Sequence, residues 1–113
     1  MNIKTKEIGD VVVLYLSGKL DSSLTRIAEE ELNEIIDKKL ESNFLLNFEE
    51  VNTMSSNGIR IIANAKNTLI KKNKVMKLCC LRNTVKRIAE VIELSSLIEI
   101  YESEEEALKS FSL

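Results

Sequence analysis

Apolar and polar positions change their spacing several times along the chain, and each change indicates an element of secondary structure. Residues 3–8 alternate loosely and predict a short strand, which Gly9 and Asp10 can join by a tight turn to the next segment. Residues 11–16 are apolar and rich in β-branched side chains, which is typical of a central strand buried on both faces. We therefore expect a hairpin, after which residues 17–21 lead out of the sheet.

A helical spacing of apolar residues follows the hairpin. Asp21, Ser22 and Ser23 are candidate N-caps for this helix. Its apolar face would comprise Leu24, Ile27, Ala28, Leu32, Ile35, Ile36 and Leu40. Residues 44–46 then predict a short buried strand. A strand, a helix and a strand in this order favour a right-handed parallel crossover.

A second helix is predicted to begin near Ser55 and Ser56. Its last turn would hold Lys71 and Lys72, and Asn73 suits the position just after the helix. The apolar face is expected to contain Ile59, Ile62, Ala63 and Leu69, widened by Ile61, Ala65 and Ile70.

The last third of the chain predicts a strand at 75–81, a helix capped by Asn83, and a short strand at 97–101. Ser103 and Glu106 fit a capping box that opens a closing helix. The pattern thus predicts an α/β domain with a mixed sheet and about four helices.

The composition excludes several classes of site. The chain contains no His, which rules out Ser-His-Asp and Cys-His catalytic pairs and histidine metal ligands. With only Gly9, Gly18 and Gly58, it can form neither a Gly-rich phosphate loop nor a dinucleotide fingerprint. Cys79 and Cys80 are adjacent, so on a strand they would point to opposite faces, and a disulfide between them would be strained. We interpret them as small apolar side chains, and expect no catalytic residue, metal or cofactor.

Hydrophobicity indicates a soluble globular protein. Hydrophobic residues make up 44% of the chain, which argues against disorder. Residues 1–6 contain no apolar signal core, and no apolar run approaches the length of a membrane span. We therefore expect a cytoplasmic domain, covering residues 1–113, with no membrane partner.

The net charge of −2 hides a strong partition along the chain. Residues 1–50 carry −5, residues 51–89 carry +9, and residues 90–113 carry −6. The basic segment contains no aromatic side chain on which a base could stack. We therefore expect no nucleic-acid partner and interpret the segment as a solvated helix end and loop with some use in protein contacts.

The segment 51–60 is the candidate functional site, because it follows a buried strand and opens a helix. Loops at the carboxyl ends of strands are where α/β proteins usually place their sites. A serine at this position is most often only a helix cap. The alternative is a hydroxyl that accepts a phosphoryl group, which would face free backbone N–H groups and the positive end of the helix dipole.

Four segments, in order, resemble the STAS domain of anti-sigma factor antagonists. Residues 17–21 are similar to the family's small-Gly-x-Leu-Asp exit from the second strand, and residues 54–59 to its phosphorylation segment. Residues 85–87 with Leu94 resemble the third helix, and residues 103–108 the closing helix. The resemblance covers essentially the whole chain and implies a mixed sheet of about five strands with helices mainly on one face.

By this resemblance the phosphorylated residue is Ser56, two positions before the glycine, with Ser55 as the alternative. The family's acidic residue just before the phosphoserine is Ser55 here, and its glycine late in the third-helix region is Glu93. The residues that would contact the partner are Asp21, Ser55, Asn57, Gly58 and Arg60.

The resemblance implies partner switching. The unphosphorylated chain would bind a kinase-type anti-sigma factor, which supplies ATP and Mg²⁺, and would thereby free a sigma factor. A serine phosphatase would reset the phosphorylated form. The chain would be a monomer and a substrate, not an enzyme.

Two other hypotheses remain open. The chain could be a non-switching STAS scaffold or ligand-binding module in which Ser56 is only a helix N-cap. It could also be a small hydrolase that uses Ser56 with a lysine base, but the local sequence offers no suitable base.

Overall fold

A mixed five-stranded sheet in the order β1-β2-β3-β4-β5 forms the centre of the computed structural model, which describes residues 3–20, 25–39 and 41–111. The strands are β1 (Lys4–Ile8), β2 (Val11–Leu20), β3 (Asn43–Met54), β4 (Met76–Cys79) and β5 (Ile100–Tyr101). β1 pairs with β2 antiparallel, and the other three pairings are parallel. The predicted hairpin and the predicted parallel pairing across the first crossover are both confirmed.

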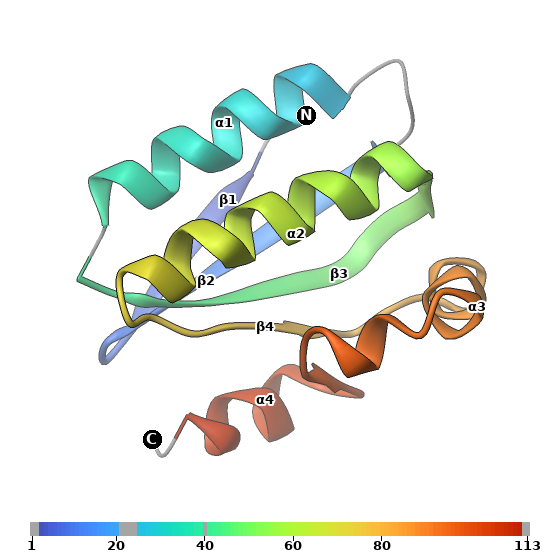
Figure 1. Ribbon diagram of the computed structural model, residues 1–113. Helices are drawn as coiled ribbons and strands as arrows, with labels where there is room; N and C mark the ends of the chain where they lie inside the picture. Colours follow the sequence, from blue (N-terminus) through green and yellow to red (C-terminus); the bar gives the residue numbers. More distant parts are fainter. Residues whose placement is uncertain (1–2, 21–24, 40, 112–113) are drawn as a thin grey trace.

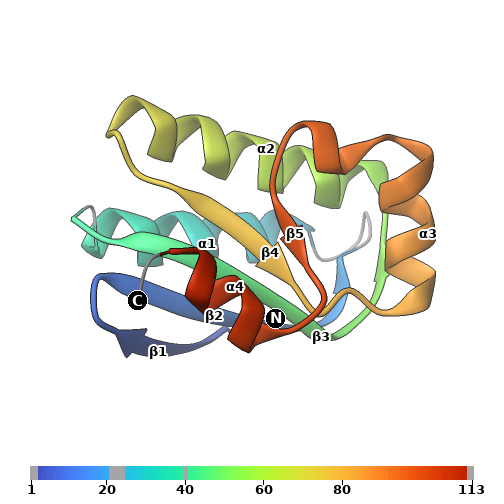
Figure 2. The same ribbon diagram turned by 90° about the horizontal axis from the view of Figure 1, so that it is seen from below.

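Helices cover the two faces of the sheet unequally. They are α1 (Thr25–Lys38), α2 (Ser56–Lys71), α3 (Asn83–Val91) and α4 (Glu104–Ser110), with a short 3₁₀ turn at Leu94–Ser96. Figure 1 shows α1 and α2 side by side over one face, α3 beside the far end of β3, and α4 beneath the sheet. Figure 2 views the sheet from the α4 side. The predicted α/β class, the five strands and the helices mainly on one face are confirmed.

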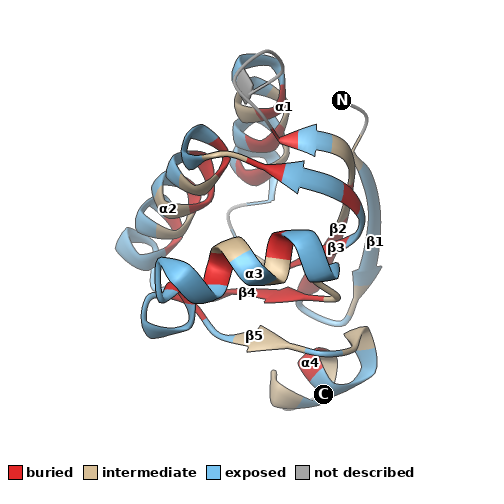
Figure 3. Ribbon diagram, turned by 90° about the vertical axis from the view of Figure 1, so that its right-hand side faces the viewer, coloured by how far each residue is buried: buried red, intermediate tan, exposed pale blue. Residues whose placement is uncertain are grey.

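Two apolar clusters correspond to these two layers. The larger joins the sheet to α1, α2 and α3 and includes Leu32, Phe48 and Val85. The smaller joins the sheet to α4 through Ala107. Figure 3 shows the buried residues of α2 and α3 on the sides that face the sheet. Hydrophobic burial on this scale, rather than local propensity, holds the four helices in place.

β2 and β3 are longer than their apolar runs predicted. β2 continues to Leu20 instead of leaving the sheet at Ser17, and β3 continues to Met54 instead of ending after residue 46. The two extensions pair with each other in parallel, with register shifts between Tyr15 and Ser17 and between Gly18 and Lys19. The shifts break the period-two alternation of apolar residues that sequence patterns detect.

Other element ends also differ from the prediction. β4 ends at Cys79 and β5 holds only two residues, while the predicted strand start at 97 follows a 3₁₀ turn. The N-cap of α3 is Arg82 rather than Asn83. Among the described helices, α4 follows the prediction most closely, since the Ser103 side chain accepts a hydrogen bond from the Glu106 N–H. The proposed caps Asp21, Ser22 and Ser23 lie outside the described residues.

Three predictions about side-chain environment are wrong. Ile70 and Ile27 are 53% and 54% exposed rather than buried. Lys77 belongs to the basic segment that was expected to be solvated, but it is buried on the α4 side. Its Nζ donates to the Ser110 carbonyl at 3.1 Å and to the Ser110 hydroxyl at 2.9 Å. Cys79 and Cys80 pack on the same face, because Cys80 follows the end of β4 with a φ of 64°. Both cysteines are free thiols.

Candidate functional site

The candidate site lies at the junction between the carboxyl ends of β2 and β3 and the start of α2. Ser55 has an extended backbone, and its N–H donates to the Leu20 carbonyl at 2.9 Å. The Ser55 hydroxyl donates to that same carbonyl at 3.2 Å. Leu20 pairs with Met54 where the parallel strands β2 and β3 end, so the last residue of β2 lies beside the start of α2 and anchors it.

Ser56 is the first residue of α2, and Ser55 occupies the N-cap position. The interpretation of Ser56 as a helix N-cap is therefore wrong. The Ser55 hydroxyl makes no capping hydrogen bond either, since it is directed to Leu20. Ser56 and Asn57 are both exposed.

The first turn of α2 is suited to an anion. The first hydrogen bond of the helix runs from the Ile59 N–H to the Ser55 carbonyl at 3.1 Å, so the preceding N–H groups have no helical acceptor. The first turn contains no acidic residue. An added negative charge would thus meet backbone donors and the positive end of the helix dipole, without a neighbouring carboxylate in that turn.

Gly58 lets α2 approach β2 closely. A Cβ at this position would lie 2.7 Å from the Leu20 carbonyl oxygen, 2.9 Å from Met54 Cγ and 3.0 Å from Leu20 Cβ. The first two distances are shorter than the contacts that real Cβ atoms make, so the junction in its present geometry requires glycine. The sequence prediction placed Gly58 among the partner-binding residues, whereas the structure gives it a buried structural role.

Arg60 lies one helical turn after Ser56. Its Nη1 atom is 3.3 Å from Glu29 Oε2, which links α2 to α1. The lysines of the basic segment are more remote: at 1.5 Å per residue along α2, Lys66 is roughly 15 Å and Lys71 roughly 22 Å from Ser56. Arg60 is therefore the positive charge on α2 that lies near Ser56. The lysines on α2 that contribute to the charge of the basic segment are too far from Ser56 to form a site with it.

The sequence did not reveal a second junction, between β3 and α3. Arg82 Nη1 donates to Asn52 Oδ1 at 2.6 Å, and the Thr84 hydroxyl donates to the Asn52 carbonyl at 2.9 Å. These bonds hold the start of α3 beside the end of β3, next to the start of α2 (Figure 1). Their partners are about thirty positions apart in the chain, and no local pattern marks them.

The shifted pKa values that the structure shows belong to other parts of the molecule. Burial, followed by a hydrogen bond to Glu104, raises the pKa of Tyr15 to about 12. Burial also raises the pKa of both cysteine thiols, foremost that of Cys79. A hydrogen bond to Glu102 raises the pKa of Lys86. These groups lie on β2, β4 or α3 or next to them, and none of them is a residue of the candidate site.

Of the predicted site residues, Ser55 is the N-cap of α2, Ser56, Asn57 and Gly58 form its first turn, and Arg60 begins the second turn. Asp21 lies outside the described residues. Over the described ranges, no cluster of three or more His, Cys, Asp or Glu side chains could hold a metal ion. No helix within those ranges is long and apolar enough to cross a membrane.

Comparisons with known proteins point to one family. The anti-sigma F factor antagonist of Paenibacillus polymyxa is 23% identical over 108 residues, covering 96% of this chain and 92% of that protein. An anti-sigma factor antagonist from Mycobacterium paratuberculosis has a similar crystal structure, with a TM-score of 0.85 at 17% identity over 96% of this chain and 92% of the other.

The antagonist SpoIIAA has been solved in two forms, and both are similar to this chain. Its unphosphorylated form gives a TM-score of 0.78 at 20% identity, covering 98% of this chain and 96% of SpoIIAA. The phosphorylated form, from Bacillus, gives 0.70 at 19% identity, covering 97% and 99%. The family model described as STAS domain matches residues 2–107. The chain therefore belongs to the STAS domain family.

Proposed function

We propose that this STAS domain is a cytoplasmic, monomeric anti-sigma factor antagonist that works by partner switching. In its unphosphorylated form it binds a kinase-type anti-sigma factor and frees a sigma factor. The anti-sigma factor phosphorylates Ser56 with its own ATP and Mg²⁺, and binding is lost until a serine phosphatase removes the phosphate. The chain itself is a substrate rather than an enzyme. The proposal rests chiefly on one observation: the exposed Ser56 hydroxyl begins a helix whose first turn has no acidic residue.

Hydrogen bonding favours Ser56 over Ser55 as the acceptor. The Ser55 hydroxyl is half-buried and donates to Leu20, and esterification with phosphate would remove that donor. A phosphate on Ser55 would also need room beside the close contact at Gly58. The Ser56 hydroxyl is exposed, and modifying it leaves the β2 junction intact.

A phosphate can block binding without refolding the domain. It adds about −1.5 to −2 charges at neutral pH, and burying such a group unpaired in an interface costs several kcal/mol. A penalty of about 3 kcal/mol already weakens binding by more than ~100-fold. The first turn of α2 can stabilise the phosphate while the partner is excluded. The similarity to SpoIIAA, which has been solved in an unphosphorylated and a phosphorylated form, supports a phosphorylation switch in this chain.

The test is site mapping after incubation with the cognate anti-sigma kinase and ATP-Mg²⁺. We expect one phosphate, on Ser56, with none in Ser56→Ala and unchanged stoichiometry in the matched control Ser55→Ala. Ser56→Ala should bind the kinase permanently, and Ser56→Asp should bind it more weakly. Phosphate on Ser55 in the wild-type chain would overturn the site assignment.

The same experiment decides between switching and a static module. An unchanged mass with a kinase that binds the chain tightly would contradict the switch and favour a scaffold. Equal kinase affinity of the phosphorylated and unphosphorylated chains would do the same. Both results leave the fold and the family intact.

A further inference from the structure

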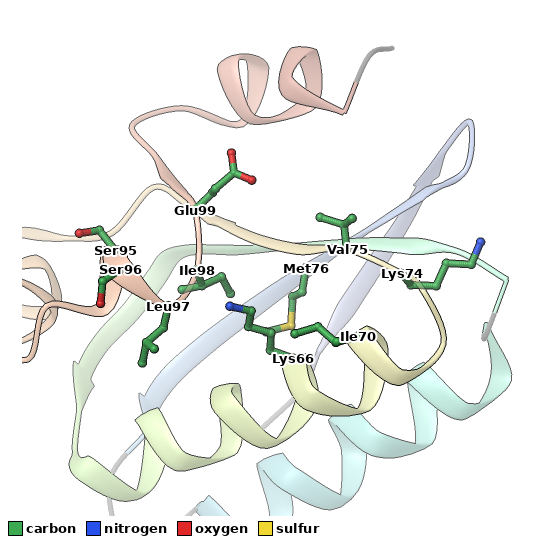
Figure 4. Close-up of a pocket in the computed structure, with 10 residues that line it drawn as sticks. All are labelled: Lys66, Ile70, Lys74, Val75, Met76, Ser95, Ser96, Leu97, Ile98 and Glu99. Atoms are coloured by element: carbon green, nitrogen blue, oxygen red, sulfur yellow. The ribbon is translucent and has the colours of Figure 1, made fainter.

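A groove lies between the C-terminal half of α2 and the segment that leads from the 3₁₀ turn into β5, far from Ser56 (Figure 4). Met76 and Ile98 are buried and form its floor. Ile70, Val75 and Leu97 stand around it and are 53%, 43% and 54% exposed. The groove has a volume of about 310 Å³ and continues toward Ala63 and Leu94 in a second hollow that shares Lys66, Leu97 and Ile98.

Exposed aliphatic side chains that gather around a groove differ from those scattered singly over a surface. Six large apolar side chains of the described chain are exposed, and three of them line this groove. Leaving them in water costs hydrophobic free energy that the domain does not recover on its own. Contact with an apolar surface of another molecule would recover it.

One rim of the groove carries unneutralised positive charge. Lys66 and Lys74 line the groove. Between them in the sequence, Lys71 is the last residue of α2 and Lys72 is its C-cap. None of these four lysines belongs to an ion pair in the described structure, although Arg60, Lys77 and Lys86 on the same basic segment all do. Glu99 also lines the groove, but its carboxylate is already paired, 3.7 Å from Lys77 Nζ. A complementary surface would therefore combine aliphatic side chains with carboxylates.

We propose that this groove is a second docking site, which binds an acidic amphipathic segment of a partner protein. Aliphatic side chains of the segment enter between Ile70 and Leu97, and its Asp and Glu side chains pair with Lys66 and Lys74. The lining contains no aromatic side chain, so it offers no platform for nucleic-acid bases. The side chains around the groove are about half exposed, so the groove is open to solvent. An open groove suits the apolar side chains along one face of a peptide, rather than a lipid chain that needs to be enclosed.

The position of the groove makes it independent of the phosphorylation site. Along α2, Ile70 lies roughly 21 Å from Ser56. That separation exceeds the Debye length of about 8 Å at physiological ionic strength, so a phosphate on Ser56 is screened from the groove. The docking site should bind its segment equally well in both phosphorylation states, and this statement does not depend on whether Ser56 is the acceptor.

The experiment is selection from a displayed library of random 16-residue peptides on the full chain, with Ile70→Asp/Leu97→Asp as the counter-selection. The expected peptides combine aliphatic residues at helical or alternating spacing with a net negative charge. Titration of the best synthetic peptide into ¹⁵N-labelled protein should shift the amides of Ile70, Val75 and Leu97. Enrichment of basic or neutral peptides, or no enrichment over the counter-selection, would refute the proposal.

Matched variants separate the groove from general surface effects. Lys66→Glu/Lys74→Glu should weaken binding of the selected peptide at least tenfold, whereas Lys6→Glu on β1 should not. Ile70→Asp should abolish binding, and Ile27→Asp on α1, which is equally exposed, should retain it. Two results would assign the groove to another occupant and overturn the proposal. One is the same amide shifts on concentrating the protein alone, which would indicate a second copy of the chain. The other is that laurate shifts these amides whereas none of the peptides does, which would indicate a lipid chain as the occupant.

Discussion

Replacing Gly58 with alanine tests how closely the candidate site depends on contact between α2 and β2. The new Cβ would lie 2.7 Å from the Leu20 carbonyl oxygen, and ordinary contact begins at 3.4 Å, so the two elements must separate by about 0.7 Å. The same carbonyl accepts both hydrogen bonds from Ser55, so the movement also strains that anchor. Overpacking of this kind costs about 1–3 kcal/mol in closely packed interiors.

An opposing effect must be subtracted. Alanine is favoured over glycine within a helix by about 1 kcal/mol, which would stabilise α2 if the position were open. The closest contact is with the Leu20 backbone, which cannot move aside as the end of a side chain can, so the upper part of the overpacking range applies, about 2–3 kcal/mol. After subtraction we expect Gly58→Ala to lower the free energy of unfolding by about 1–2 kcal/mol, and the melting temperature by roughly 4–8 °C per kcal/mol. The measurement is urea unfolding followed by circular dichroism. The matched control is Asn57→Ala, an exposed neighbour that should change stability by no more than about 0.5 kcal/mol. A Gly58→Ala protein as stable as the wild type, or more stable, would refute the steric argument. The higher helix propensity of alanine would then outweigh any clash with Leu20.

Three further predictions concern backbone strain, pH and charge. Glu93 adopts a φ of 54°, so Glu93→Gly should raise the free energy of unfolding by about 0.5–1 kcal/mol in urea titrations, and a loss of stability would contradict it. The pKa of Tyr15 is 10.0 in its ordinary state and about 12 in the fold, so the unfolded chain releases the Tyr15 proton at lower pH than the folded chain does. The free energy of unfolding therefore falls as pH rises from about 10 to about 12. Tyr15→Phe should remove this part of the decline, as measured by urea unfolding midpoints across that pH range. Phosphorylation of Ser56 should raise the free energy of unfolding by about 0.3–1 kcal/mol, with a smaller gain in Arg60→Ala, and a melting temperature that falls on phosphorylation would contradict it.

Local chemistry in the sequence predicted several element boundaries correctly. The start of α2 near Ser55 and Ser56, the position of Asn73 just after the end of α2, and the Ser103 cap of α4 are all confirmed. Each of these depends on residues within a few positions of one another. The candidate site was therefore accessible from sequence as a helix start.

Features that depend on distant pairing were not accessible in this way. Glu49 and Glu50 interrupt the apolar pattern of β3, yet the strand continues because β2 offers it a parallel partner. Ile70 has helical spacing that suggests burial, but the segment that could cover it stops short of it and leaves a groove. The close approach at Gly58 exists only where β2 and α2 meet, and the sequence around a glycine cannot distinguish such a contact from a partner surface.

The anchor of the candidate site relies little on side-chain identity. It joins the Ser55 N–H to the Leu20 carbonyl, and it asks only for a residue without a Cβ at position 58. Ser56, Asn57 and Arg60 are exposed, so changing them costs little folding free energy. Under the proposed function, the exposed side chains that the partner contacts can therefore change in evolution while the backbone frame that holds Ser56 stays fixed. Duplicated copies of such a gene could diverge in this turn alone and come to serve separate partners in one cell without cross-talk.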